Sequence, residues 1–242
     1  MLFCAAMVFF LSSCGGNGSG ENAGKDTATA ATDTAAKTAV VAAPVNTTIT
    51  TPVNMVVITH KVSNFAKWLP AYEAHDSARL ANGLHNYVIG RGAMDSNMVM
   101  VVLKPDDIAK AKAFSKDPGL KVAMQKGGVV GAATISLQVS TWQDTAVIGT
   151  VLRSRTTFTV KDWDAWLKTF EEGRQERLDN GITDRVIGHD IDDNKKVSLV
   201  TAVMDTAKAF AYYKSDALKK RRAAGGVIGT PERFLFHVVK RY

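Results

Sequence analysis

Five side chains with acid–base or anion-binding chemistry fall on two short runs rich in strand-forming residues. The first run carries His85, Tyr87 and Arg91, and the second carries Arg185 and His189. Because side chains alternate along a strand, those within each run should share one face of a sheet. If that face lines a pocket, arginine could hold an anionic or enolisable ligand while histidine takes or gives a proton. A solvated strand face is the plainer interpretation, and the sequence leaves both open.

Three further residues lie on predicted strands. His60 falls on the apolar face of an early strand, and a lone histidine there is typical of a core residue with satisfied nitrogens rather than a haem or metal ligand. Arg153 and Arg155 share one face of a later strand, which indicates either an anion site or a salt-bridged sheet edge. Histidines and cysteines lack the spacing of metal ligands, so we expect no metal and no cofactor.

A duplicated segment shows which residues the fold itself requires. Residues 65–131 recur as 163–229 without insertion or deletion, a period long enough for a domain. Both copies keep a helical tryptophan and arginine, Trp68/Trp166 and Arg79/Arg177, which we assign to the fold. Positions where the copies differ are where we expect function. They include His85/Thr183 and Arg91/His189.

The elements that must position these residues follow from hydrophobic periodicity. Copy one reads as strands over 55–62, 84–91, 98–103 and 135–142, with helices over 65–83 and 108–126, the second interrupted at Asp117-Pro118. Copy two repeats the order with strands near 150–160, 182–190, 196–202 and 232–240 and helices near 162–180 and 205–223. This order predicts an α+β protein with two tandem ferredoxin-like βαββαβ repeats, 53–142 and 148–242, packed sheet to sheet.

Within each copy the pattern Trp-x3-Tyr/Phe-x6-Arg-x3-Gly-Leu/Ile precedes Val-Ile-Gly and a late Gly-Gly-Val-x-Gly. This pattern resembles the dimeric α/β-barrel superfamily, the antibiotic biosynthesis monooxygenase-like group. The resemblance implies a fused dimeric α/β barrel, since members usually pair two ferredoxin-like chains. It implies no single activity, because the superfamily includes cofactor-free oxygenases, haem enzymes, isomerases and stress proteins.

The N-terminal segment predicts export and lipidation. Residues 1–13 form an apolar stretch typical of a signal peptide, and Leu11-Ser12-Ser13-Cys14 resembles the bacterial lipobox, which implies cleavage before Cys14 and acylation of its sulfur. An ordinary signal peptide or a buried N-terminal helix is the alternative. Residues 14–52 are too poor in apolar side chains to fold, so we expect a disordered tether. Gly15 directly after the modified Cys, in place of Asp, resembles lipoproteins that Gram-negative cells send to the outer membrane, and this resemblance implies an outer-membrane location in the cell envelope.

Composition narrows the function classes. The net charge of +7 is spread over both copies, and with the export signal this argues against a nucleic-acid partner. We therefore expect a lipid-anchored envelope protein whose barrel binds a small molecule or serves structurally. The alternative is a cofactor-independent monooxygenase or isomerase that uses the His, Tyr and Arg group, and haem-dependent chemistry is a third possibility. Further oligomerisation is left open.

Overall fold

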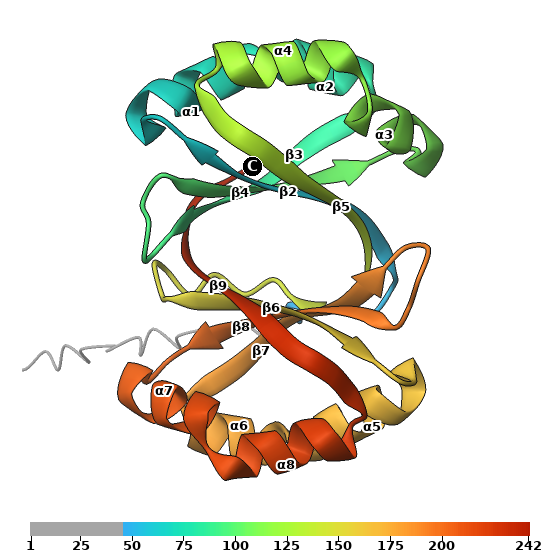
Figure 1. The fold of residues 1–242 in the computed structure, drawn as a ribbon, viewed down its shortest axis with the longest axis vertical. Coiled ribbons are helices and arrows are strands. Elements are labelled where there is room, and N and C mark those ends of the chain that lie inside the picture. Colours follow the sequence, from blue (N-terminus) through green and yellow to red (C-terminus); the bar gives the residue numbers. More distant parts are fainter. Residues whose placement is uncertain (1–45) are drawn as a thin grey trace, which may run out of the picture. The chain divides into compact units, whose positions relative to one another are not determined.

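The computed structural model of the chain describes residues 46–242, which belong to one compact unit (Figure 1). The expected signal peptide (1–13), the expected modified Cys14 and most of the expected tether lie outside the described residues. The predicted tether is too long at its C-terminal end, because Thr48–Ile49 form a short strand, β1, that pairs with Gln143 and Asp144.

Each repeat has the predicted order of elements. Repeat 1 consists of β2 (Val53–Val62), α1 (Phe65–Ala74), α2 (Asp76–Ala81), β3 (Leu84–Gly92), β4 (Met98–Pro105), α3 (Ile108–Ser115), α4 (Pro118–Lys126) and β5 (Val129–Asp144). Repeat 2 consists of β6 (Arg153–Val160), α5 (Trp163–Glu172), α6 (Arg174–Asp179), β7 (Ile182–Asp190), β8 (Lys196–Val203), α7 (Thr206–Lys214), α8 (Asp216–Ala224) and β9 (Val227–Arg241). The tandem ferredoxin-like α+β architecture is therefore confirmed.

The two sheets join into a closed barrel. Within each repeat the strands are antiparallel, and the long last strands reach across: β9 pairs with both β6 and β3, and β5 pairs with both β2 and β7. Both pairs of sheet edges are thereby satisfied, which removes the open edges that favour aggregation. The helices lie outside, covering the sheet of their own repeat (Figure 1).

Every helical layer is broken into two short helices. The predicted break at Asp117-Pro118 is confirmed, with the Asp117 side chain capping α4 and Pro118 in its first turn. The break between α1 and α2, at His75, was not expected, because the apolar spacing predicts one helix over 65–83. Repeat 2 breaks at the equivalent Gly173.

The arginines that both copies share stabilise these breaks between helices. Arg79 donates from Nη1 to the carbonyl oxygen of Tyr72 at 2.8 Å, and Arg177 donates to that of Phe170 at 2.5 Å. Each guanidinium also lies over the ring of the residue whose carbonyl it binds. Carbonyls at a helix end lack intrahelical partners, so a buried guanidinium there satisfies them. The structural role predicted for Arg79 and Arg177 is confirmed.

Three layers of apolar side chains hold the molecule together. Repeat 1 has one cluster between helices and sheet, around Trp68, and repeat 2 has two, around Trp166 and around Tyr212. A further cluster fills part of the barrel interior, where Met55, Met100 and Phe236 come from both repeats. Spaces left in these layers are the places where a ligand can be held.

Candidate functional site

An irregularity in each second strand changes the predicted faces. The pairing register shifts at Tyr87 in β3 and at Arg185 in β7, so one extra residue stands in each strand. Such a bulge reverses the faces of the residues beyond it. The expectation that His85, Tyr87 and Arg91 share a face, and that Arg185 and His189 do, therefore fails at Arg91 and His189, which lie beyond the bulges. His85 pairs with Lys104 and stays on the face of Tyr87, because Lys104 lies over the Tyr87 ring. Tyr87 and Arg185 line the barrel interior.

His85 and Arg91, near the two ends of β3, lie apart from each other. His85 is exposed, with its Nε2 2.9 Å from the Asp106 carboxylate. Arg91, beyond the bulge, lies on the helix-covered face, with its guanidinium carbon 4.4 Å from the centre of the Phe65 ring. Its Nε donates to the backbone carbonyl of Ser96 at 2.6 Å.

His189 also lies on the helix-covered face of its sheet. Its ring meets Trp163 edge to face at 4.7 Å, and its Nδ1 lies 2.8 Å from the carbonyl oxygen of Asp190. His85, Arg91 and His189 line none of the three cavities described below. The five predicted site residues thus form no single constellation.

Two equivalent pockets and one central cavity lie within the described part of the chain. Each equivalent pocket lies between the helices and the sheet of one repeat. The repeat-1 pocket has a volume of about 270 Å³, against about 80 Å³ for the repeat-2 pocket. The repeat-1 pocket is lined by Ile58, His60, Trp68, Ala71, Tyr72, Ala78, Arg79, Val101, Leu103, Phe114, Leu120, Ala123, Met124 and Val129, among others.

His60 is the most unusual residue of the repeat-1 pocket. It is 4% exposed, and neither ring nitrogen has a hydrogen-bond partner. Its ring meets Trp68 edge to face at 5.5 Å. Burial lowers the pKa of His60 from 6.5 to about 4, because the charged form would lose its hydration. The imidazole is therefore neutral at neutral pH, with one free donor and one free acceptor.

The expectation that His60 is a satisfied core residue is half right. It is buried as expected, but it is unsatisfied. The signal was available in the repeat. Phe158 occupies the equivalent position and meets Trp166 with the same geometry, 5.5 Å and edge to face, so the fold fills this place with an apolar ring. A polar ring in repeat 1 is a departure that packing alone does not require.

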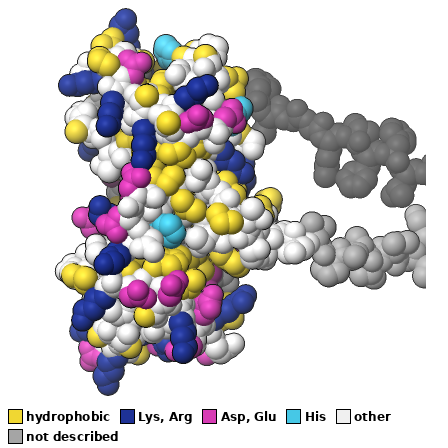
Figure 2. Space-filling model, turned by 90° about the vertical axis from the view of Figure 1, so that its right-hand side faces the viewer, with side chains coloured by type: hydrophobic (Ala, Val, Ile, Leu, Met, Phe, Trp, Pro, Cys, Tyr) yellow, Lys and Arg dark blue, Asp and Glu magenta, His cyan; other side chains and the backbone are white. Residues whose placement is uncertain are grey.

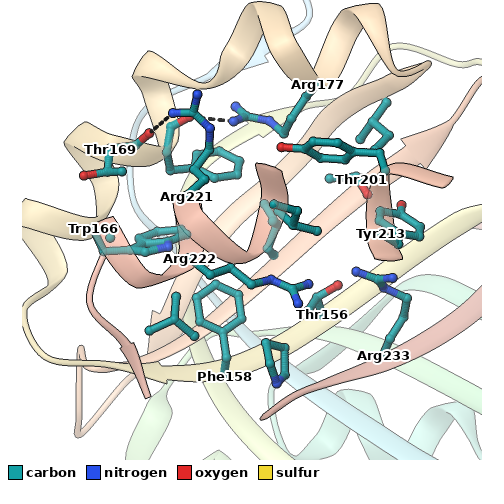
Figure 3. A pocket seen from close by; sticks show the side chains of 18 residues that line it. Thr156, Phe158, Trp166, Thr169, Arg177, Thr201, Tyr213, Arg221, Arg222 and Arg233 are labelled. Atoms are coloured by element: carbon teal, nitrogen blue, oxygen red, sulfur yellow. Dashed lines mark hydrogen bonds between the residues drawn. The ribbon is translucent and has the colours of Figure 1, made fainter. Parts of the chain in front are cut away.

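Larger side chains fill the repeat-2 pocket. Ala78 and Ala123 of repeat 1 correspond to Glu176 and Arg221. The Arg221 Nε donates to the Glu176 carboxylate at 2.6 Å, so these two residues occupy space that both alanines leave open. Arg221 also reaches the carbonyl oxygen of Thr169 (Figure 3).

Two more arginines enter the repeat-2 pocket. Arg222 replaces Met124, and Arg222 and Arg233 point toward each other from α8 and β9, with Thr156 between them in the view of Figure 3. The Arg233 guanidinium lies 3.5 Å from the centre of the Tyr213 ring. Burial lowers the pKa of both arginines. This pocket is smaller and more cationic than its counterpart in repeat 1.

The third cavity lies inside the barrel and has a volume of about 80 Å³. Arg153 and Arg155 line it together, which confirms that they share a face. They do not mark a sheet edge, because β6 pairs with β9 on one side and β8 on the other. Arg185 lines the same cavity and donates to Asp144 at 2.5 Å.

Metal sites and surface features give little further guidance. Within residues 46–242 no group of three His, Cys, Asp or Glu side chains lies close enough to hold a metal ion. In the same range no helix is both long and apolar enough to cross a membrane. On the face shown in Figure 2, basic and acidic side chains are interspersed rather than gathered in one basic patch.

Comparisons with known proteins bear on the fold. No protein-family model matches the chain, and neither does any curated protein. Among solved structures, a candidate monooxygenase from Fusobacterium nucleatum is 12% identical with a TM-score of 0.50, over 78% of this chain and 93% of that chain.

Two further matches have lower TM-scores. A candidate chlorite dismutase is 15% identical with a TM-score of 0.49, over 78% of this chain and 96% of that chain. An uncharacterised ferredoxin-fold protein from Listeria monocytogenes, related to antibiotic biosynthesis monooxygenases, is 8% identical with a TM-score of 0.45, over 79% and 97%. The strand order of the chain and its likeness to the F. nucleatum protein show a ferredoxin-like α+β barrel fold, with both halves of the barrel in one chain.

Proposed function

We propose that this chain is a lipid-tethered protein of the bacterial envelope that binds one small, largely apolar molecule in the repeat-1 pocket. The difference between the two equivalent pockets carries this proposal. One copy of the fold keeps about 270 Å³ open where the other, with larger side chains, keeps about 80 Å³. An open apolar cavity costs stability, so a cavity retained in one copy alone favours a ligand that occupies it.

His60 supplies one polar contact of this pocket, which the unpartnered Nε of Arg79 also lines. A buried imidazole without partners carries a desolvation penalty of about 1–3 kcal/mol that a ligand hydroxyl can relieve. Aromatic side chains, Trp68 and Tyr72, stack at 5.0 Å beside it. We therefore expect a ligand with an aromatic or alicyclic body and one hydroxyl or carbonyl group.

The experiment compares naphthol with naphthalene by isothermal titration calorimetry on the full chain. Both molecules have the apolar body, but naphthol alone donates a hydrogen bond. The wild type should bind naphthol about three- to tenfold more tightly, the equivalent of one net hydrogen bond. The His60→Phe variant copies repeat 2 at Phe158 and should lose this preference. Equal affinities for the two molecules in the wild type would contradict a hydrogen bond between His60 and the ligand.

A second candidate function is cofactor-independent oxygenation or isomerisation in the same pocket. Its support is the neutral imidazole, which can accept a proton from a phenol, and the likeness in fold to the F. nucleatum candidate monooxygenase. Oxygen uptake in the presence of naphthol, absent in His60→Phe, would favour this candidate. Binding without oxygen uptake or a change in the naphthol favours the non-catalytic function.

The envelope location rests on the sequence around Cys14. A thioether-linked lipid at Cys14 would hold the barrel on a membrane, and the following segment, poor in apolar side chains, would act as a tether. Outer-membrane sorting is the expected destination, given Gly15 after the modified residue. A small molecule that partitions into or crosses the envelope is a fitting ligand for such a protein.

A further inference from the structure

The barrel cavity has chemically unequal halves. At four interior positions where repeat 2 places arginine, repeat 1 places an uncharged side chain. The pairs, with repeat 1 first, are Met55/Arg153, Val57/Arg155, Tyr87/Arg185 and Gln143/Arg241. Other interior positions stay apolar in both repeats, such as Val102 and Val200. Barrel closure therefore does not itself require the arginines.

The unpartnered buried atoms of this cavity are all hydrogen-bond donors. They are Nε and Nη2 of Arg153, Nε of Arg185 and Nε2 of Gln143. The three residues are 4%, 3% and 2% exposed, so bulk solvent does not compensate them. No buried side-chain acceptor of the described lining residues is unpartnered, so this set of buried donors is suited to a ligand that only accepts hydrogen bonds.

The charges of the lining point the same way. Asp144 is the one carboxylate among the described lining residues, and its oxygens accept from Arg185, from the Thr47 hydroxyl and from the Ala146 backbone N–H. Arg153 forms no ion pair among the described residues. A buried guanidinium outside an ion pair is costly, and the Asp144 carboxylate already accepts from Arg185, so an anion beside Arg153 is favoured.

We infer that the barrel cavity binds a small oxyanion, a carboxylate or phosphate, in contact with the free Nε and Nη2 of Arg153 and supported by Arg185 and Gln143. Nε and Nη2 lie on the same side of the guanidinium, so they present two parallel N–H groups to two oxygens. The cavity volume of about 80 Å³ exceeds the roughly 30 Å³ share of one water molecule and suits an anion of a few heavy atoms. Arg241 lines the same cavity, is exposed, and gives the anion a cationic approach.

This site is separate from the repeat-1 pocket. No residue lines both cavities, and the barrel cavity lies on the opposite face of the sheets from the helices. Loss of naphthol binding therefore leaves the anion site untested, and loss of anion binding leaves the repeat-1 pocket untested. The two proposals can fail independently.

The test is calorimetric titration of the full chain with sodium acetate and, separately, sodium phosphate at constant ionic strength. Acetate probes a carboxylate ligand and phosphate probes a phosphoryl ligand. We expect one saturable site per chain for at least one of these anions. The Arg153→Met variant, which copies repeat 1 at Met55, should bind that anion at least tenfold more weakly. Arg222→Met, in the repeat-2 pocket, should stay within twofold of the wild type.

Two results would overturn the inference. One is the absence of saturable binding of either anion by the wild type, which means that water alone hydrates the arginines. The other is equal binding by Arg153→Met and the wild type. If Arg153→Met fails to fold, Gln143→Leu removes a single donor from the cavity and should weaken binding about fivefold. Unchanged binding in that variant would equally contradict the assignment.

Discussion

Arg221, which lines the repeat-2 pocket, forms an ion pair with Glu176 beside it, with 2.6 Å between the guanidinium Nε and a carboxylate oxygen. The equivalent residues of repeat 1 are Ala123 and Ala78. This exchange of two positions is one of the differences between the filled pocket and the open one, together with Arg222 in place of Met124. The duplication supplies a natural comparison in which fold and pocket position are held constant.

Transplanting that ion pair should close the repeat-1 pocket. We expect the double variant Ala78→Glu/Ala123→Arg to bind naphthol at least tenfold more weakly than the wild type, because the new side chains occupy the cavity. The matched control is Ala66→Glu/Ala109→Arg, which adds the same charges at two exposed positions on α1 and α3. Calorimetric titration of both variants gives the comparison. Full-strength binding by the transplanted variant would place the ligand elsewhere.

The buried imidazole of His60 should make stability depend on pH. Its folded pKa, about 4, lies below its unfolded value of 6.5, so only the unfolded state takes up a proton between these values. Stability contributed by the neutral form is therefore complete above pH 6.5 and is lost as the pH falls toward 4. The loss is at most roughly 3–4 kcal/mol, the free-energy equivalent of the difference between a pKa of 6.5 and one of about 4.

His60→Phe is the control for this pH dependence. Urea unfolding at pH 7 and pH 4.5 should give a free energy of unfolding that falls more in the wild type than in the variant. Other groups titrate identically in both proteins and cancel in the comparison. Identical pH profiles would mean that the imidazole is solvated or partnered in solution.

Closure of the barrel between β5 and β7 depends on Gly188. A Cβ at this position would collide with the backbone carbonyl oxygen of Val139 and approach Cα of Ser140 to 3.0 Å. Gly188→Ala should therefore destabilise the protein by about 1–3 kcal/mol, because backbone on the facing strand must move. The melting temperature should fall by roughly 2–4 °C per kcal/mol.

The equivalent position in repeat 1 is the control. A Cβ at Gly90 meets the Phe236 side chain, which can rotate or shift more easily than backbone. Gly90→Ala should accordingly lower the melting temperature less than Gly188→Ala. The reverse order would mean that the β5–β7 seam is more compliant than its geometry indicates.

Lipidation at Cys14 is tested in cells. Growth with an alkyne-bearing palmitate analogue should label the wild-type chain, and Cys14→Ser should abolish the label and move the protein from the membrane fraction to the soluble fraction. Cys4→Ser keeps the Cys14 thiol and should retain both properties if processing removes residues 1–13. Labelling that persists in Cys14→Ser would contradict the lipobox interpretation.

The sequence predicted the helices and strands better than it predicted which face of a strand each side chain occupies. The two aligned copies predicted the order of strands and helices correctly, because apolar periodicity and capping residues such as Asp117 are local features of the sequence. The reversed faces of Arg91 and His189 were missed because a bulge depends on pairing with neighbouring strands, and alternation within one strand carries no information about that pairing.

The candidate site was partly visible in the differences between copies. His60 against Phe158 was such a difference, but its significance depends on whether the ring nitrogens find partners, which only packing reveals. Arg153 and Arg155 were predicted to share a face, and the β6 pairings on both sides then exclude a sheet edge. The exchange of Ala123 for Arg221 indicates a difference in pocket volume only once the structure places both residues in the lining of a pocket.

The number of ligands bound per chain tests the central claim most directly. Titration of the full chain with naphthol should give one site per chain, although the fold is present twice, and this site should bind at least tenfold more weakly in the Ala78→Glu/Ala123→Arg variant. Two equivalent sites per chain, or one site that keeps its full affinity in this variant, would contradict the claim that repeat 1 alone keeps a ligand pocket.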